Sequence, residues 1–105
     1  MTPTALSSLS SLALRLKDTL ELETVSFGAK VRVSRAILNL TQDEFATRIG
    51  LTQKSVHRIE QGLVEPKIRT VLAVEQFWRD NNLDFQDLPD GGFTLAVHGS
   101  VLSNR

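Results

Sequence analysis

The sequence predicts a mainly α-helical fold that ends in a small β-hairpin. Apolar residues recur at helical spacing through most of the chain, and after residue 82 this spacing changes to strict alternation. With 105 residues, of which 41% are hydrophobic, the chain has room for one compact domain with a short extension at either end.

The composition excludes several classes of protein. The chain has no cysteine, which rules out a disulfide framework, a thiolate metal site and a cysteine nucleophile. The chain contains no run of 18 apolar residues, so no membrane span is predicted. The N-terminus lacks the basic start of a secretory signal, and a cytoplasmic location is therefore expected. Because His57 and His98 are isolated and no glycine-rich phosphate loop is present, we expect no enzyme activity, cofactor or metal.

The net charge is zero, but the charges are unevenly distributed. Residues 28–79 hold nine Lys or Arg against five Asp or Glu, a net +4, whereas residues 1–27 sum to −1 and residues 80–105 to −3. A basic centre between acidic ends is a weak indication of phosphate binding.

The N-terminal segment is predicted to form a helix over residues 4–21. Its apolar stripe has helical spacing and consists of Leu6, Leu9, Ala13, Leu16 and Leu20. Such a stripe must be covered, either by the same domain or by a helix from a second subunit, since two heptads are too few to stand alone.

Four further helices are predicted over residues 27–38, 41–50, 52–62 and 68–81. Asn39 is expected to end the first of these in a left-handed conformation. Thr41 with Glu44 forms a capping box for the next helix. Thr52 caps the third, and Pro66 prevents its continuation beyond Gly62.

The C-terminal part is predicted to be a β-hairpin with strands over residues 83–88 and 93–98. The segments LDFQDL and FTLAVH alternate apolar and polar residues, and the intervening PDGG is a turn signal. Because an isolated hairpin is marginally stable, it must pack on the helices or pair across a subunit boundary.

Two short helices, in TQDEFATRIG and LTQKSVHRIEQG, carry the most specific pattern. Ala46 is small enough for two helices to cross closely, and Gly50 can adopt the positive φ of the turn between them. Together with the preceding FGAKVRVSRAILNL, this stretch resembles the helix-turn-helix of Cro and the phage repressors, the Xre-type regulators, and the resemblance extends to about Asn81.

This resemblance implies a five-helix phage-repressor-like helix-turn-helix domain, to which the chain adds an N-terminal helix and a C-terminal β-hairpin. The expected division is residues 1–25 for the leucine-rich helix, 26–82 for the DNA-binding domain and 83–105 for the hairpin and tail. The resemblance also implies that the second helix of the motif lies in the DNA major groove and that a homodimer reads a two-fold-symmetric operator.

The resemblance assigns roles to individual residues. The side chains expected to read bases are Gln53, Lys54, His57 and Arg58. Those expected to contact phosphate are Gln42, Thr52, Ser55, Lys67 and Arg69. Arg35 and Glu60 correspond to an ion pair that ties the recognition helix to its scaffold. For His57, a solvated position or a phosphate contact is as compatible with the sequence as a base contact.

The sequence therefore predicts a DNA-binding transcriptional regulator, a repressor of phage-like or mobile-element genes or of its own operon. There are two alternatives: an antitoxin that represses its own operon, and an adaptor that binds a protein partner such as an activator. The adaptor is disfavoured by the basic and amide side chains on the outward face of the second motif helix. The leucine stripe, the hairpin edge and the last helix remain open as dimer surfaces, with the two terminal elements preferred.

Overall fold

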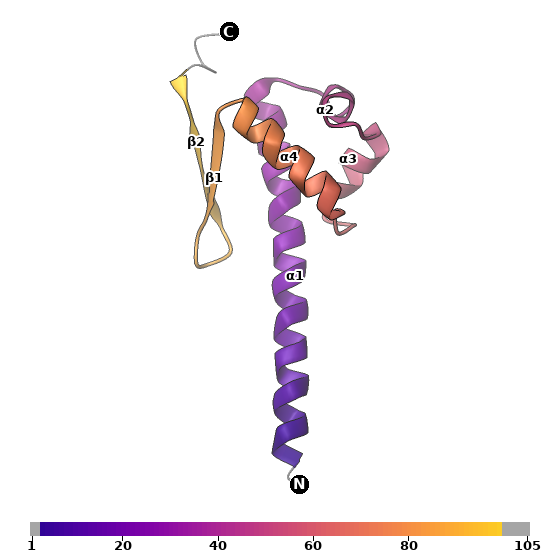
Figure 1. Cartoon of the computed structure of the whole chain (residues 1–105), viewed down its shortest axis with the longest axis vertical. Helices are drawn as coiled ribbons and strands as arrows, with labels where there is room; N and C mark the ends of the chain where they lie inside the picture. The colour runs from indigo at the N-terminus through magenta and orange to yellow at the C-terminus, as the bar shows by residue number, and fades with distance from the viewer. Residues whose placement is uncertain (1–2, 100–105) are drawn as a thin grey trace.

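The computed structural model describes residues 3–99, with side chains from residue 9 onward. Four α-helices are followed by a two-stranded antiparallel sheet: α1 (Pro3–Leu38), α2 (Gln42–Ile49), α3 (Gln53–Glu60), α4 (Ile68–Asp80), β1 (Leu83–Asp87) and β2 (Phe93–Val97). In Figure 1, the C-terminal part of α1 packs against the other elements and its N-terminal part projects away from them. We call residues 9–22 of α1 the stem and residues 23–99 the head.

The predicted break between the first two helices is wrong. Residues 4–21 and 27–38 belong to one helix of 36 residues, so the described part of the chain holds four helices and not a five-helix head with an extra helix. Residues 22–26 contain neither proline nor glycine, and the Thr24 hydroxyl donates to the Leu20 carbonyl inside the helix (2.9 Å) instead of capping a new one. The side chain of Leu6, in the predicted stripe, lies outside the described residues.

Gly28 lies inside α1, at the point where the end of α3 approaches α1 closely. A Cβ atom at residue 28 would lie 2.2 Å from the carbonyl oxygen of Ile59, far inside van der Waals contact. The glycine therefore serves the approach of two helices and does not mark a helix end.

The predicted caps around α2 and α3 are confirmed, although α3 ends at Glu60, two residues before the predicted stop at Gly62. Asn39 ends α1 with φ of 56°, and Gly50 has φ of 76° in the turn after α2. The capping box of α2 is complete: the Glu44 N–H donates to Thr41 Oγ1, and the Thr41 N–H donates to Glu44 Oε1, both at 3.0 Å. At α3, the Ser55 N–H donates to Thr52 Oγ1 at 3.2 Å.

One hydrophobic core joins the head. Its buried members come from α1, all three short helices and the start of β1: Val31, Phe45, Ala46, Val56, Ile59, Val74, Phe77, Trp78 and Leu83. Phe45 and Phe77 pack edge to face with ring centroids 5.0 Å apart. This core fixes α2 and α3 relative to each other and holds both on α1 and α4.

The hairpin packs on the helices, as its marginal stability requires. Its register pairs Leu83 with Val97 and Phe85 with Leu95. Each strand is one residue shorter than predicted. The Phe85 ring lies 4.6 Å from that of Trp78, measured between centroids. Lys30 of α1 reaches the far end of β1 and binds Asp87 at 2.6 Å.

Candidate nucleic-acid interface

Helices α2 and α3 form a compact two-helix unit. Phe45 and Ala46 of α2 and Val56 and Ile59 of α3 are buried, and the turn between the helices passes through Gly50. Because Ala46 is buried at 1% exposure and carries only a methyl group, α3 can lie close across α2. The apolar side of α3 is thereby fixed and its opposite side faces solvent.

The solvent-facing side of α3 carries all four predicted base-reading residues. Gln53, Lys54, His57 and Arg58 are exposed. Neither Lys54 nor Arg58 forms an ion pair or a side-chain hydrogen bond with any other described residue. This face therefore presents two free cations and two groups that can donate or accept hydrogen bonds.

A chain of hydrogen bonds links this face to the scaffold. Gln53 Nε2 donates to Gln42 Oε1 at 2.7 Å, and Gln42 Nε2 donates in turn to Glu60 Oε1 at 3.1 Å. Gln42 Nε2 also lies 3.4 Å from His57 Nδ1. The amide of Gln42 thus contacts three residues of α3, and it orients Gln53 from the neighbouring helix.

Arg35 and Glu60 anchor this hydrogen-bond chain to α1. Arg35 Nε donates to Glu60 Oε2 at 2.7 Å and Nη2 donates to Oε1 at 2.8 Å, in a two-pronged contact. Arg35 Nη1 also donates to the carbonyl of Leu40 at 3.1 Å, which ties the end of α1 to the same pair. The Glu60 side chain is only 2% exposed, whereas that of Arg35 is 21% exposed.

The pair shifts the titration of both partners. Burial raises the pKa of Glu60, but hydrogen bonds from Arg35 and Gln42 and attraction to Arg35 outweigh it, so the net pKa lies below the ordinary 4.5. The hydrogen bond to Glu60 raises the pKa of Arg35. Both groups are therefore charged near neutral pH.

The predicted phosphate-contacting residues are in three different situations. Thr52 and Ser55 are engaged with each other, since Thr52 Oγ1 also donates to Ser55 Oγ at 2.9 Å. Lys67 and Arg69 are exposed at the start of α4, which has no side-chain cap. Gln42 lies in the first turn of α2, but the oxygen and the nitrogen of its amide are both engaged within the head.

Sequence reasoning missed the contact between Gln42 and Gln53. The signal was present, because each glutamine directly follows a capping threonine, Thr41 and Thr52, and so begins its helix. Because α2 and α3 cross near Ala46, their first residues, Gln42 and Gln53, come within hydrogen-bonding distance. The two glutamines were expected to contact DNA separately, whereas in the structure Gln53 Nε2 donates to Gln42 Oε1.

Comparison with known proteins agrees with this geometry. Residues 31–77 match a family model described as Helix-turn-helix. A protein of Methanocaldococcus jannaschii, an uncharacterized HTH-type transcriptional regulator, is 29% identical over 49 residues, which cover 47% of this chain and 74% of that protein. The family match runs from the C-terminal part of α1 to Phe77 in α4, so the stem and the hairpin lie outside it.

Proposed function

Starting from the premise that residues 31–77 are a helix-turn-helix domain of the Cro and phage-repressor (Xre) type, we propose that this chain is a sequence-specific DNA-binding transcriptional regulator. In this proposal it acts as a homodimeric repressor that inserts α3 into the major groove at each half of a two-fold-symmetric operator. Occlusion of a promoter by the bound dimer would then stop transcription.

The observation that carries the proposal is the composition of the exposed side of α3. Gln53 can bind the N6 and N7 edge of adenine, and Lys54 and Arg58 can bind O6 and N7 of guanine. No acidic side chain lies on this side of the helix, because Glu60, the acid of α3, is buried against Arg35. The face therefore suits a polyanion and offers hydrogen-bond donors of the kinds that bind base edges.

The hydrogen-bond chain behind α3 supports base reading by Gln53. A side chain that is already held by Gln42 loses less conformational freedom when it binds, so more of its interaction energy contributes to discrimination. Each well-placed contact of this kind discriminates by about 1 to 3 kcal/mol. Gln42 Nε2 already donates to Glu60 and lies 3.4 Å from His57 Nδ1, so a contact from this amide to a phosphate would compete with these interactions.

Contacts to phosphate would come mainly from the exposed cations at the start of α4. The side chains of Lys67 and Arg69 form no hydrogen bond or ion pair with other described residues, so binding DNA breaks no interaction at either side chain. Such contacts supply affinity that depends on salt and positions the protein without reading sequence.

In vitro selection from a random DNA pool tests the proposal. The wild type and the double variant Gln53→Ala/Arg58→Ala should be selected side by side at fixed salt, with Arg79→Ala as a control. Arg79 is also an exposed arginine, but it lies on α4 and contacts Gln76. The wild type and the control should enrich one two-fold-symmetric site, and the double variant should not.

Enrichment of no site by the wild type would contradict the proposal. A symmetric site that is also enriched by the double variant would contradict the assignment of α3 as the reader.

A further inference from the structure

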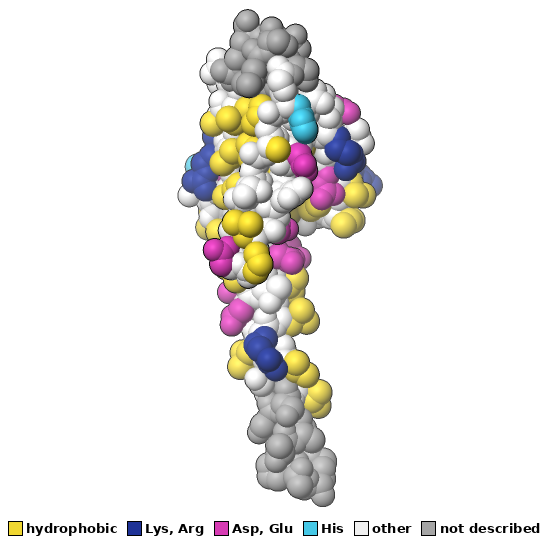
Figure 2. Space-filling view, turned by 90° about the vertical axis from the view of Figure 1, so that its left-hand side faces the viewer, with side chains coloured by type: hydrophobic (Ala, Val, Ile, Leu, Met, Phe, Trp, Pro, Cys, Tyr) yellow, Lys and Arg dark blue, Asp and Glu magenta, His cyan; other side chains and the backbone are white. Residues whose placement is uncertain are grey.

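The stem carries an apolar surface that the rest of the described chain leaves uncovered. Every residue from 9 to 23 is exposed, including Leu9 at 63% and Leu16 at 62%. At about 100° per residue, Leu9, Leu16, Leu20 and Phe27 fall on one side of the helix. From here on we call these four residues the stripe, in place of the predicted set; Phe27, the last of them, lies in the head and is partly buried against Trp78. Figure 2 shows hydrophobic side chains along the right-hand edge of the projecting part of the molecule.

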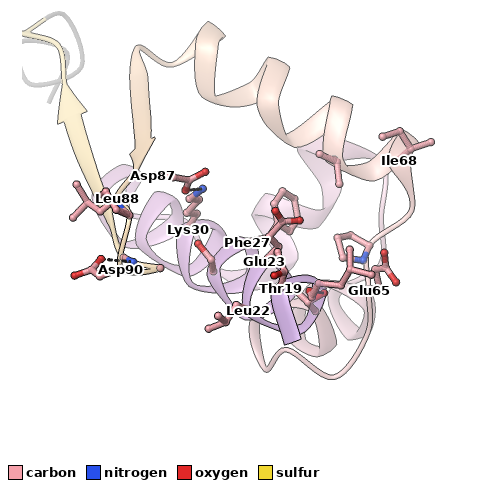
Figure 3. Close-up of a pocket in the computed structure, with 18 residues that line it drawn as sticks. Thr19, Leu22, Glu23, Phe27, Lys30, Glu65, Ile68, Asp87, Leu88 and Asp90 are labelled. Carbon is pink, nitrogen blue, oxygen red and sulfur yellow. Dashed lines mark hydrogen bonds and ion pairs between the residues drawn. The ribbon is translucent and has the colours of Figure 1, made fainter. Parts of the chain in front are cut away.

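The stripe leads directly into a groove in the head. This groove has a volume of about 720 Å³ and lies between α1, the start of α4 with the loop before it, and the turn of the hairpin. Its apolar lining comes from all three elements: Leu20, Leu22, Phe27, Ile68, Val71 and Leu88. Ile68 is 74% exposed and Leu88 is 42% exposed, so both stand at the open side of the groove. Figure 3 shows the labelled residues gathered around the end of the stem.

We propose that the stem of a second copy of this chain lies antiparallel along the first and inserts its N-terminal leucines into this groove. The inference rests on the proposed homodimer and specifies its interface. With the two-fold axis near residue 18, the partner's Leu9 would lie beside Phe27, and the partner's Leu16 beside Leu20. Each groove is then filled by the other chain, and both halves of the stripe are buried.

The charges of the stem favour the antiparallel direction. Its basic residues, Arg15 and Lys17, precede its acidic residues, Asp18 and Glu21, and Glu23 follows directly after the stem. In an antiparallel pair centred near residue 18, Arg15 and Lys17 of one stem lie at the level of residues 19–21 of the other, which include Glu21, while Asp18 lies near the axis on the side of the helix away from the stripe. A parallel pair would instead align like charges, which destabilises helix pairing, and would leave both grooves unfilled.

The same arrangement places both recognition helices on one side of the dimer. Gly28 and Arg35 are the residues of α1 that contact the end of α3. At about 100° per residue, both lie about a quarter turn around the helix axis from the stripe. The two-fold axis of an antiparallel helix pair is perpendicular to the plane of the two helices. Features a quarter turn from the interface therefore face the same way in both copies.

The spacing between the recognition helices also suits DNA. The contacts at residues 28 and 35 of α1 both involve the C-terminal end of α3, and their midpoint lies about 13 residues from the proposed axis. At a rise of about 1.5 Å per residue, the C-terminal ends of the two α3 helices lie roughly 40 Å apart along the stem. This is close to the separation of about 34 to 36 Å between half-sites one turn apart on DNA.

Two matched substitutions test the face. Leu16→Glu places a charge on the stripe, whereas Leu14→Glu places the same charge on the opposite side of the helix, at a residue that is equally exposed in the single chain (64% against 62%). Sedimentation equilibrium without DNA should show dimerisation weakened at least about 100-fold by Leu16→Glu and less than about threefold by Leu14→Glu. Equal effects, or a dimer insensitive to Leu16→Glu, would overturn the inference.

Disulfide cross-linking tests the direction, and the absence of cysteine makes each introduced thiol unique. A size-tagged Ala13→Cys chain and an untagged Glu23→Cys chain should cross-link to each other when mixed, while Ala13→Cys alone should not. Within one chain the two positions are roughly 15 Å apart along the helix, too far for a disulfide. Self-cross-linking of Ala13→Cys would indicate a parallel pair and overturn the inference.

These tests separate this inference from the proposed function. A dimer that forms by another surface, such as the hairpin edge, would overturn the stem interface and leave the homodimer intact. A wild type that stays monomeric at high concentration would remove both the stem interface and the homodimer, while DNA reading by α3 would still be decided by the selection experiment.

Discussion

The ion pair between Arg35 and Glu60 gives a sharp prediction about stability. The two partners differ in burial, since the Glu60 side chain is 2% exposed and that of Arg35 is 21% exposed. Arg35→Met removes two hydrogen bonds and the compensating charge from a carboxylate that water cannot reach, and leaves only the bond from Gln42. We therefore expect Arg35→Met to lower the free energy of unfolding by about 3 to 5 kcal/mol.

The reverse change should cost less. Glu60→Gln keeps the volume of the side chain and leaves behind Arg35, which is partly exposed and keeps its bond to the Leu40 carbonyl. The expected loss is about 1 to 3 kcal/mol. The double variant Arg35→Met/Glu60→Met should be more stable than Arg35→Met alone, because replacing both charges removes the unpaired one.

Urea unfolding measures these differences, with the fluorescence of Trp78 as the probe. Trp78 is the single tryptophan of the chain, is 7% exposed and contacts Phe27 and Phe85 in the core. All variants should be compared at one protein concentration, so that dimer dissociation contributes equally to each measured free energy of unfolding. A smaller loss for Arg35→Met than for Glu60→Gln would refute the reasoning from burial. A Glu60→Ala variant that melts like the wild type yet no longer binds DNA would refute the view that this pair acts through stability.

Three further predictions concern the head. Gly28→Ala should destabilise by at least about 2 kcal/mol, since its Cβ would meet the Ile59 carbonyl, while Gly99→Ala, with open space around it, should be nearly neutral in the same urea titration. Thr41→Ala should cost about 1 kcal/mol by removing the cap of α2, and the loss should be visible as a lower melting temperature by circular dichroism. The pKa of Glu60 is lower in the folded protein than its ordinary 4.5, so its contribution to stability is full above that value and is lost as the pH falls through the folded pKa. The unfolding free energy should therefore fall below about pH 4.5 and should fall less steeply in Glu60→Gln; an identical slope would contradict this assignment.

Local chemistry made much of the head predictable. Thr41 and Thr52 cap helices through hydrogen bonds that depend only on neighbouring residues, and Asn39 and Gly50 adopt left-handed conformations that few residues tolerate. The alternation in the last segment likewise requires only a two-residue period, and the hairpin was placed within one residue. Signals of this kind do not depend on which elements pack together.

Features that depend on packing were not predictable in the same way. Glycine in a helix interior is destabilising, and only the close approach of the Ile59 carbonyl shows why Gly28 stands inside α1. Gln42 is an exposed-looking residue at a helix start, yet its amide joins Gln53 to Glu60. Such contacts join residues that are 11 and 18 positions apart, and they exist only once the helices have crossed.

The most direct test of the central claim, that the exposed side of α3 reads base sequence, is equilibrium binding to the selected site and to a scrambled duplex over a range of salt. Arg58→Ala should lose about 1 to 3 kcal/mol on the selected site, with a smaller loss on the scrambled one, so that specificity falls. Lys67→Ala should weaken both by the same factor and reduce the salt slope by about 1. If Arg58→Ala instead weakened both duplexes equally, α3 would contact the DNA backbone without reading its bases, and the claim would be wrong.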